Sequence, residues 1–164
     1  METKTKVFKG CSIKFSITIE KGESIEKLIA DGKYETITEK ASEIISSLTN
    51  NEEETPQVMD IELIEFQNKP DEIDVQKEII KRGLLFCEDI DALRFGAKYN
   101  EIGSLLGKES ACSIMFPHEI STHSRKSKAI LSIDYRCEKR ILSQGGFGTK
   151  LFERWFFAGL RPRK

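Results

Sequence analysis

The sequence predicts an α+β fold in which an antiparallel sheet packs against three or four helices, with a strand-rich C-terminal half. Apolar residues alternate with polar ones over 11–19, the pattern of a strand with one buried face. Residues 71–102 carry apolar side chains at helical spacing on both sides of Gly83. Short apolar runs bounded by turn-forming residues then predict strands at 111–116, 129–135 and 151–160.

A chain of 164 residues suits one domain, and we predict that 1–164 is a single α+β unit. The acidic loop at 50–56 is the best candidate boundary, so the alternative is a strand–helix unit at 1–50 and a second unit at 57–164. The apolar runs are far shorter than the roughly 18 residues of a membrane span. No apolar segment of a signal peptide follows the N-terminus, so we expect a cytoplasmic protein without membrane association.

Local signals mark the elements of the N-terminal half. Ser24 is a suitable N-cap for a helix that stops at Asp31-Gly32. A second helix is expected from 37 or 38 to 48, and a second strand over 58–66. The inward positions of the second helix are expected to be Ile37, Ala41, Ile44, Ile45 and Leu48.

The segment 71–102 predicts two helices joined at Gly83. Asp71 suits the start of the first helix, and Gly83 suits the left-handed position after its end. Its inward residues are expected to be Ile73, Gln76, Ile79 and Ile80. The second helix is expected to begin near Cys87, with inward residues Ile90, Leu93, Ala97 and Ile102.

Turns are expected between the C-terminal strands. Residues 121–128 form a basic, Ser-rich stretch, and residues 136–140 form a charged one. In an alternative interpretation, strand pairing resumes at 141–142. Residues 143–150, with three glycines, are expected to be a flexible hairpin loop before the last strand.

Five stretches carry a resemblance to a known family. They are SIEKLIADGKY at 24–34, MDIELIEF at 59–66, KRG at 81–83, DIDALRFGAKY at 89–99 and RWFFAGLR at 154–161. In order and spacing the chain resembles a family of uncharacterised bacterial proteins. It departs from that family after Tyr34, where the family has a Trp or an Asn-rich link, after Gly83, where the family has a Pro, and over 103–128. The resemblance implies a shared fold and, because the family has no established activity, no reaction.

The charge of the chain is unevenly divided. Residues 1–120 hold 15 Lys/Arg and 24 Asp/Glu, a balance of −9, whereas residues 121–164 hold 11 and 3, a balance of +8. Two interpretations follow: the oppositely charged parts attract each other within one fold, or the C-terminal part presents a surface to an anionic partner.

The second interpretation singles out a set of basic residues in turns and in the tail. They are Arg125, Lys126, Lys128, Arg136, Lys139, Arg140, Arg161 and Arg163. Trp155, Phe156, Phe157 and Phe147 lie among them in sequence. Basic side chains with exposed aromatic rings are able to hold phosphates and stack bases, and basic side chains alone suit an acidic protein.

The sequence contains no strong signal for a metal, a cofactor or a catalytic group. His118 and His123 are five residues apart, whereas the zinc motif H-E-x-x-H needs four. Residues 145–150 have Lys after Thr, unlike a Walker loop. The four cysteines lack a C-x-x-C pair, which favours reduced buried thiols over disulfides or a metal site.

These observations favour a non-enzymatic binding protein that uses its basic C-terminal third to engage an acidic protein. One alternative is a small enzyme whose site the sequence does not reveal. The other is a nucleic-acid-binding protein. No oligomeric state is predicted.

Overall fold

The structure is a computed structural model that describes residues 7–50, 56–66, 70–101, 111–118, 130–136, 139–145 and 154–162, with side chains from Ser12 onward. The strands are β1 (Val7–Ile19), β2 (Thr36–Ile37), β3 (Gln57–Phe66), β4 (Cys112–Met115), β5 (Ile130–Arg136), β6 (Lys139–Gly145) and β7 (Arg154–Arg161). The helices are α1 (Ile25–Gly32), α2 (Glu39–Ser46), α3 (Glu72–Lys81) and α4 (Asp89–Lys98).

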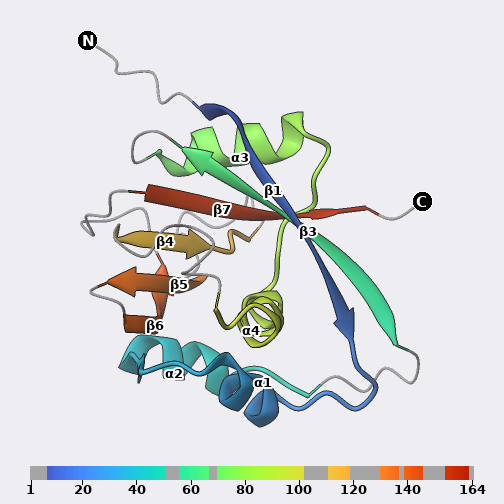
Figure 1. The fold of residues 1–164 in the computed structure, drawn as a ribbon, viewed down its shortest axis with the longest axis vertical. Coiled ribbons are helices and arrows are strands. Elements are labelled where there is room, and N and C mark those ends of the chain that lie inside the picture. The colour runs from blue at the N-terminus through green and yellow to red at the C-terminus, as the bar shows by residue number, and fades with distance from the viewer. Residues whose placement is uncertain are drawn as a thin grey trace.

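All seven strands belong to one sheet, in the order β1-β3-β7-β4-β5-β6-β2 (Figure 1). The predicted α+β class, with four helices in the described chain and most strands in the C-terminal half, is confirmed. The prediction of a purely antiparallel sheet is wrong, because β7 runs parallel to β4 and β2 runs parallel to β6. The cause is topological: β7 enters between β3 and β4, two strands that precede it in the chain.

Helices cover both faces of the sheet (Figure 1). Residues of α1, α2 and α4 share one hydrophobic core with one face, and residues of α3 share a second core with the other. Within β7, Phe156 and Ala158 belong to the first core, whereas Trp155 and Phe157 belong to the second. This double burial explains why β7 is apolar along nearly its whole length.

The cap predicted at Ser24 is present, and Thr38, for which no cap was predicted, caps α2 in the same way. The hydroxyls of Ser24 and Thr38 accept hydrogen bonds from backbone N–H groups in the first turns of α1 and α2. The predicted stop at Asp31-Gly32 is wrong by one position, since Gly32 still belongs to α1 and Lys33 takes the left-handed conformation with φ 50°. The two-residue strand β2 has no clear signal in the sequence.

The prediction for α3 is right about its ends and about Ile79, and wrong about Ile73 and Ile80. The Asp71 carboxylate caps its start, and Gly83 follows its end with φ +68°. However, Val75 and Ile79 face the sheet, whereas Ile73 and Ile80 are 61% and 65% exposed. Successive helical residues are rotated by about 100°, so positions 73 and 75 lie on opposite sides and only one set can be buried.

The second predicted helix begins two residues later than expected. Glu88 and Asp91 form a capping box at the start of α4. Leu93 is buried as predicted, Ile90 is half-buried, and Ile102 lies outside the described residues. Between the helices, Leu85 pairs with Leu160 through two backbone hydrogen bonds of 2.8 Å, beyond the point at which β4 ends.

The predictions for residues 136–140 and 143–150 need correction. The strands β5 and β6 reach Arg136 and Lys139, which leaves no five-residue turn there. The strand β6 continues to Gly145 and neighbours β5 and β2, so the following loop does not join a hairpin with β7. The many polar residues of β6 concealed its strand pattern. Residues 121–128 and 146–153 lie outside the described residues.

The edge strand β1 is tied to α4 by Tyr99. The Tyr99 hydroxyl donates to the backbone oxygen of Ser16 (2.8 Å) and accepts from the backbone N–H of the same residue (3.2 Å). The pairing of β1 with β3 also shifts register between Val7 and Ser12. Both features interrupt the row of outward backbone groups that an edge strand presents.

The ring of Tyr34 packs directly against two helical glycines, Gly32 and Gly96. A Cβ on Gly32 would lie 2.3 Å from Cε2 of Tyr34, and a Cβ on Gly96 would lie 1.8 Å from its hydroxyl oxygen. Any side chain at either position would therefore displace the ring. The two glycines let α1 and α4 approach the same aromatic residue.

We therefore expect Gly96→Ala to lower the free energy of unfolding by about 2 kcal/mol, the cost of overpacking. In an unobstructed helix the same change gains about 1 kcal/mol. Tyr34→Phe removes the nearest clashing atom, so the double variant should lose less stability than the sum of the single variants. Denaturant unfolding of the wild type, the two single variants and the double variant measures this coupling. Additive losses of stability would contradict the close packing of Tyr34 against Gly96.

Candidate functional site

The eight basic residues predicted to bind a partner divide into two groups. The structure describes Arg136, Lys139, Arg140 and Arg161. Arg125, Lys126, Lys128 and Arg163 lie outside the described residues.

Arg140 points into the protein and is only 5% exposed. Its guanidinium donates to the backbone oxygens of Gly96 (2.7 Å) and Tyr99 (3.2 Å), at the C-terminal end of α4. It also lies over the ring of Tyr34, 5.0 Å from the centroid. A cation at this end of a helix satisfies free carbonyls and complements the helix dipole. Arg140 therefore stabilises the fold and adds nothing to an exposed basic surface.

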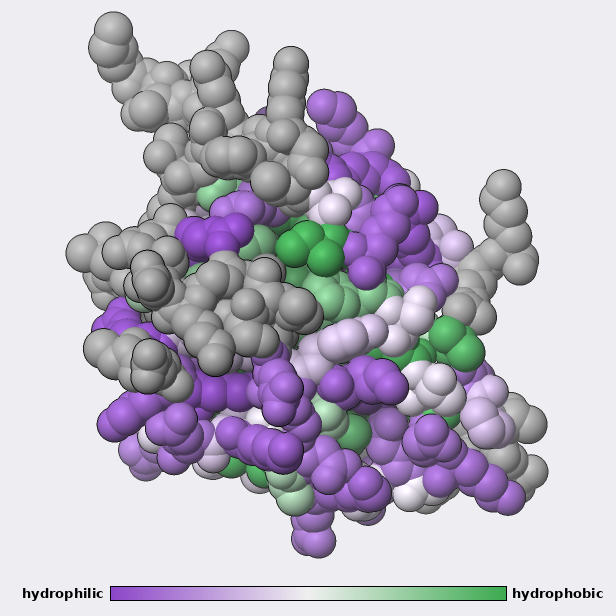
Figure 2. Space-filling model, in the orientation of Figure 1, coloured by the Kyte–Doolittle hydropathy of each residue, from purple (hydrophilic) through white to green (hydrophobic). Residues whose placement is uncertain are grey.

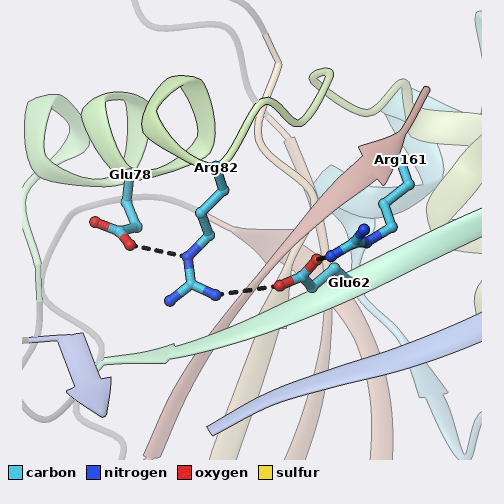
Figure 3. Close-up of polar contacts among 4 residues, drawn as sticks. All are labelled: Glu62, Glu78, Arg82 and Arg161. Carbon is cyan, nitrogen blue, oxygen red and sulfur yellow. Dashed lines mark hydrogen bonds and ion pairs between the residues drawn. The ribbon is translucent and has the colours of Figure 1, made fainter. Parts of the chain in front are cut away.

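Arg161 belongs to an ion-pair network that links β3, β7 and α3 (Figure 3). The buried Glu62 carboxylate accepts from Arg161 (2.9 Å) with one oxygen and from Arg82 (3.1 Å) with the other. Arg82 is held in turn by Glu78, at 2.8 Å. Burial raises the pKa of Glu62, but hydrogen bonds from Ser12, Arg161 and Arg82 outweigh it and leave the pKa below its usual value.

A second pair joins the same two strands near their other end. Arg154 of β7 donates to both oxygens of Glu65 of β3, at 2.8 and 3.1 Å. Together with Glu62 and Arg161, this pair shows that basic residues of the C-terminal third meet acidic residues of the earlier part. Of the two interpretations of the uneven charge, attraction within the fold accounts for these arginines.

Arg136 and Lys139 are the two predicted residues that the structure leaves exposed at the end of a hairpin. They stand directly opposite each other in the register of β5 and β6. Like charges at opposed positions repel. In the next opposed pair, Tyr135 and Arg140, the arginine turns inward.

The outward side of α3 is a surface that the sequence prediction missed. We define the α3 outer face as the four exposed residues Ile73, Lys77, Ile80 and Lys81. Figure 2 shows that most of the viewed surface is hydrophilic, with apolar residues confined to small areas. The sequence contains one indication of this face. The apolar residues of α3 form two helical stripes, Val75 with Ile79 and Ile73 with Ile80, and the sheet buries only the first.

A histidine–carboxylate pair joins the end of β4 to the start of α4. His118 Nε2 lies 2.9 Å from Asp89 Oδ1, and both side chains are partly exposed. Cys87, close to Asp89 in sequence, is buried and free, and burial raises its pKa well above the usual value. Burial therefore favours the protonated thiol at Cys87 and shields it from solvent. His123 lies outside the described residues.

In the part of the chain that the structure describes, no three His, Cys, Asp or Glu side chains gather as metal ligands. None of the described helices has the length and hydropathy needed to cross a membrane. No protein-family model, curated protein or solved structure matches the chain.

Glu62→Gln should lower the free energy of unfolding by about 2 kcal/mol at pH 7, because it removes charged hydrogen bonds to two partly exposed arginines. Since the folded pKa of Glu62 is lowered, its contribution is present above the unfolded value of 4.5 and is lost as the pH falls through the folded pKa. The difference in the free energy of unfolding between the wild type and the variant should therefore become smaller in acid. Urea unfolding at several pH values measures this difference.

The exposed Glu43 of α2 supplies a matched control, and Glu43→Gln should change stability by less than about 0.5 kcal/mol. A gap for Glu62→Gln that stays constant from neutral pH into acid would contradict the ion-pair explanation.

The described cysteines should be unreactive in the folded protein. Burial raises the pKa of Cys112 to about 11 and that of Cys87 well above its usual value. At pH 8 the Cys112 thiolate is then about one part in a thousand. We expect iodoacetamide to modify neither residue in native protein and both in guanidinium, scored by peptide mass spectrometry. Native labelling of either at the unfolded rate would contradict this burial.

Proposed function

We propose that this protein is a non-enzymatic binding protein that engages an acidic protein through basic residues exposed in its C-terminal third. The observation that carries the proposal is the opposed, exposed pair of Arg136 and Lys139. Both side chains are exposed and positively charged, which suits the carboxylates of a partner protein. An acidic partner placed over the hairpin end would attract both charges.

The burial of the aromatic residues favours an acidic protein over nucleic acid. Binding of single-stranded nucleic acid typically stacks bases on exposed aromatic rings. Trp155, Phe156 and Phe157 are all 3% exposed or less, so these rings do not reach a ligand at the surface. Phe147 lies outside the described residues. The basic side chains are therefore left to act as charges, which suits the carboxylates of a protein.

A small enzyme is the second candidate, and the His118–Asp89 pair is the observation that favours it. A carboxylate that holds one nitrogen of a partly exposed imidazole is an arrangement suited to a general base. An activity that His118→Asn abolishes, while Arg136→Glu/Lys139→Glu leaves it unchanged, would favour the enzyme.

The binding proposal predicts a specific effect of charge reversal. Arg136→Glu/Lys139→Glu should keep the fold and weaken binding of the acidic partner at least about tenfold, because two attractions become repulsions. The partner is recovered by affinity capture from the native host, and its dissociation constant is then measured with purified proteins at two salt concentrations.

The matched control reverses two exposed lysines elsewhere, Lys21→Glu/Lys40→Glu, and should leave the partner bound. Arg140→Glu should unfold the protein instead, because that side chain is buried at the end of α4. An unchanged set of partners in the Arg136/Lys139 variant would overturn the proposal. Recovery of nucleic acid, with binding that weakens steeply as salt rises, would favour the nucleic-acid-binding alternative instead.

A further inference from the structure

The α3 outer face exposes two large apolar side chains on one line. Ile73 and Ile80 are seven residues apart, which is close to two helical turns, so they project from the same side of the helix. Each keeps more than half of its surface in contact with water. A single exposed isoleucine is ordinary, but an aligned pair on a short helix resembles half of a helix-packing seam.

The polar residues of the same face are both basic. Lys77 lies about 40° and Lys81 about 80° around the helix axis from Ile73, so both project from the same side of α3. The acidic residues of α3 are half-buried: Asp74 lies beside Lys81 at the edge of this face, and Glu78 is already bonded to Arg82. The α3 outer face therefore presents two apolar groups and two exposed positive charges, with half-buried carboxylates at its edges.

The opposite side of the helix holds this face in place. Val75 and Ile79 are buried against the sheet. The Asp71 carboxylate caps the first turn, and backbone N–H groups of Gly83 and Leu84 bond to the last turn. A face formed in advance loses little conformational entropy when a partner binds.

We propose that the α3 outer face is a docking site for an acidic amphipathic helix of a partner protein. Apolar side chains of that helix would pack on Ile73 and Ile80, and its carboxylates would pair with Lys77 and Lys81. Such a helix matches both the spacing and the charge of the four residues. This site is separate from Arg136 and Lys139 and stands without them.

Two other occupants fit the α3 outer face less well. In a twofold pairing with a second copy, Ile73 would meet Ile80, and Lys77, midway between them, would meet its own counterpart. That arrangement brings like charges together. An anionic membrane surface would attract the lysines, but two isoleucines are a small apolar face compared with those of membrane-surface helices.

The test is a selection from a displayed library of random 16-residue peptides against the purified full-length protein. The same library is passed over the variant Ile73→Ser/Ile80→Ser. A second variant, Lys77→Glu/Lys81→Glu, tests the charges. All four positions are exposed, so both variants should keep the wild-type circular dichroism and melting temperature. The matched controls are Val58→Ser, another exposed apolar residue, and Lys40→Glu.

We expect enriched peptides to be acidic, with apolar residues at helical spacing, and to shift the amide resonances of α3. Each double variant should weaken them at least about tenfold, and the controls should weaken them less than about twofold. Basic peptides, no enrichment, or equal binding to the Ile73/Ile80 variant would overturn the proposal. Self-association of the wild type, or its binding to phosphatidylserine vesicles, would also overturn the proposal if the Ile73→Ser/Ile80→Ser variant abolishes it. Because Arg136 and Lys139 stay unchanged, failure here leaves the proposed function to be judged by its own variants.

Discussion

The whole structure depends on the burial of β7 on both faces. This strand lies between β3 and β4, and its side chains alternate between the core beneath α1, α2 and α4 and the core beneath α3. Both cores therefore include side chains of this one strand. Gly159, against which Leu84 packs closely, leaves room for the chain that returns from α3 beside β7. Since β7 follows all the other described strands in sequence, neither core is complete until this strand has been added.

The charges of the chain follow the same arrangement. The acidic residues of β3 that face inward meet arginines of β7, so that Glu62 holds Arg161 and Glu65 holds Arg154. A buried carboxylate is tolerable only with such partners. Part of the basic excess of the C-terminal third is therefore neutralised by ion pairs within the sheet. Among the described residues of that third, Arg136 and Lys139 are exposed at the hairpin end and Arg161 is exposed but bonded to Glu62, while Lys77 and Lys81 form a second basic surface outside that third.

Features with local causes were predictable from the sequence. The caps at Ser24 and Asp71 and the left-handed Gly83 follow from hydrogen bonds and backbone freedom within a few residues, and all three are confirmed. The sheet order and the orientation of α3 depend on distant partners, so periodicity alone did not decide them. At the candidate site, a strand reading of 139–145 would have placed Arg140 on the inward side with Leu142. The resemblance to a bacterial family remains a prediction.

The two borders of the sheet are finished in different ways. At one border β2 has only two residues, and at the other the Tyr99 hydroxyl takes both outward backbone groups of Ser16. A long strand with free amides is a template on which further strands can stack into a fibril. Here the short border offers too little length, and the long one is obstructed at Ser16 by a side chain from another element. The exposed isoleucines of α3 lie on a helix, so contacts through them would leave both borders of the sheet blocked to further strands.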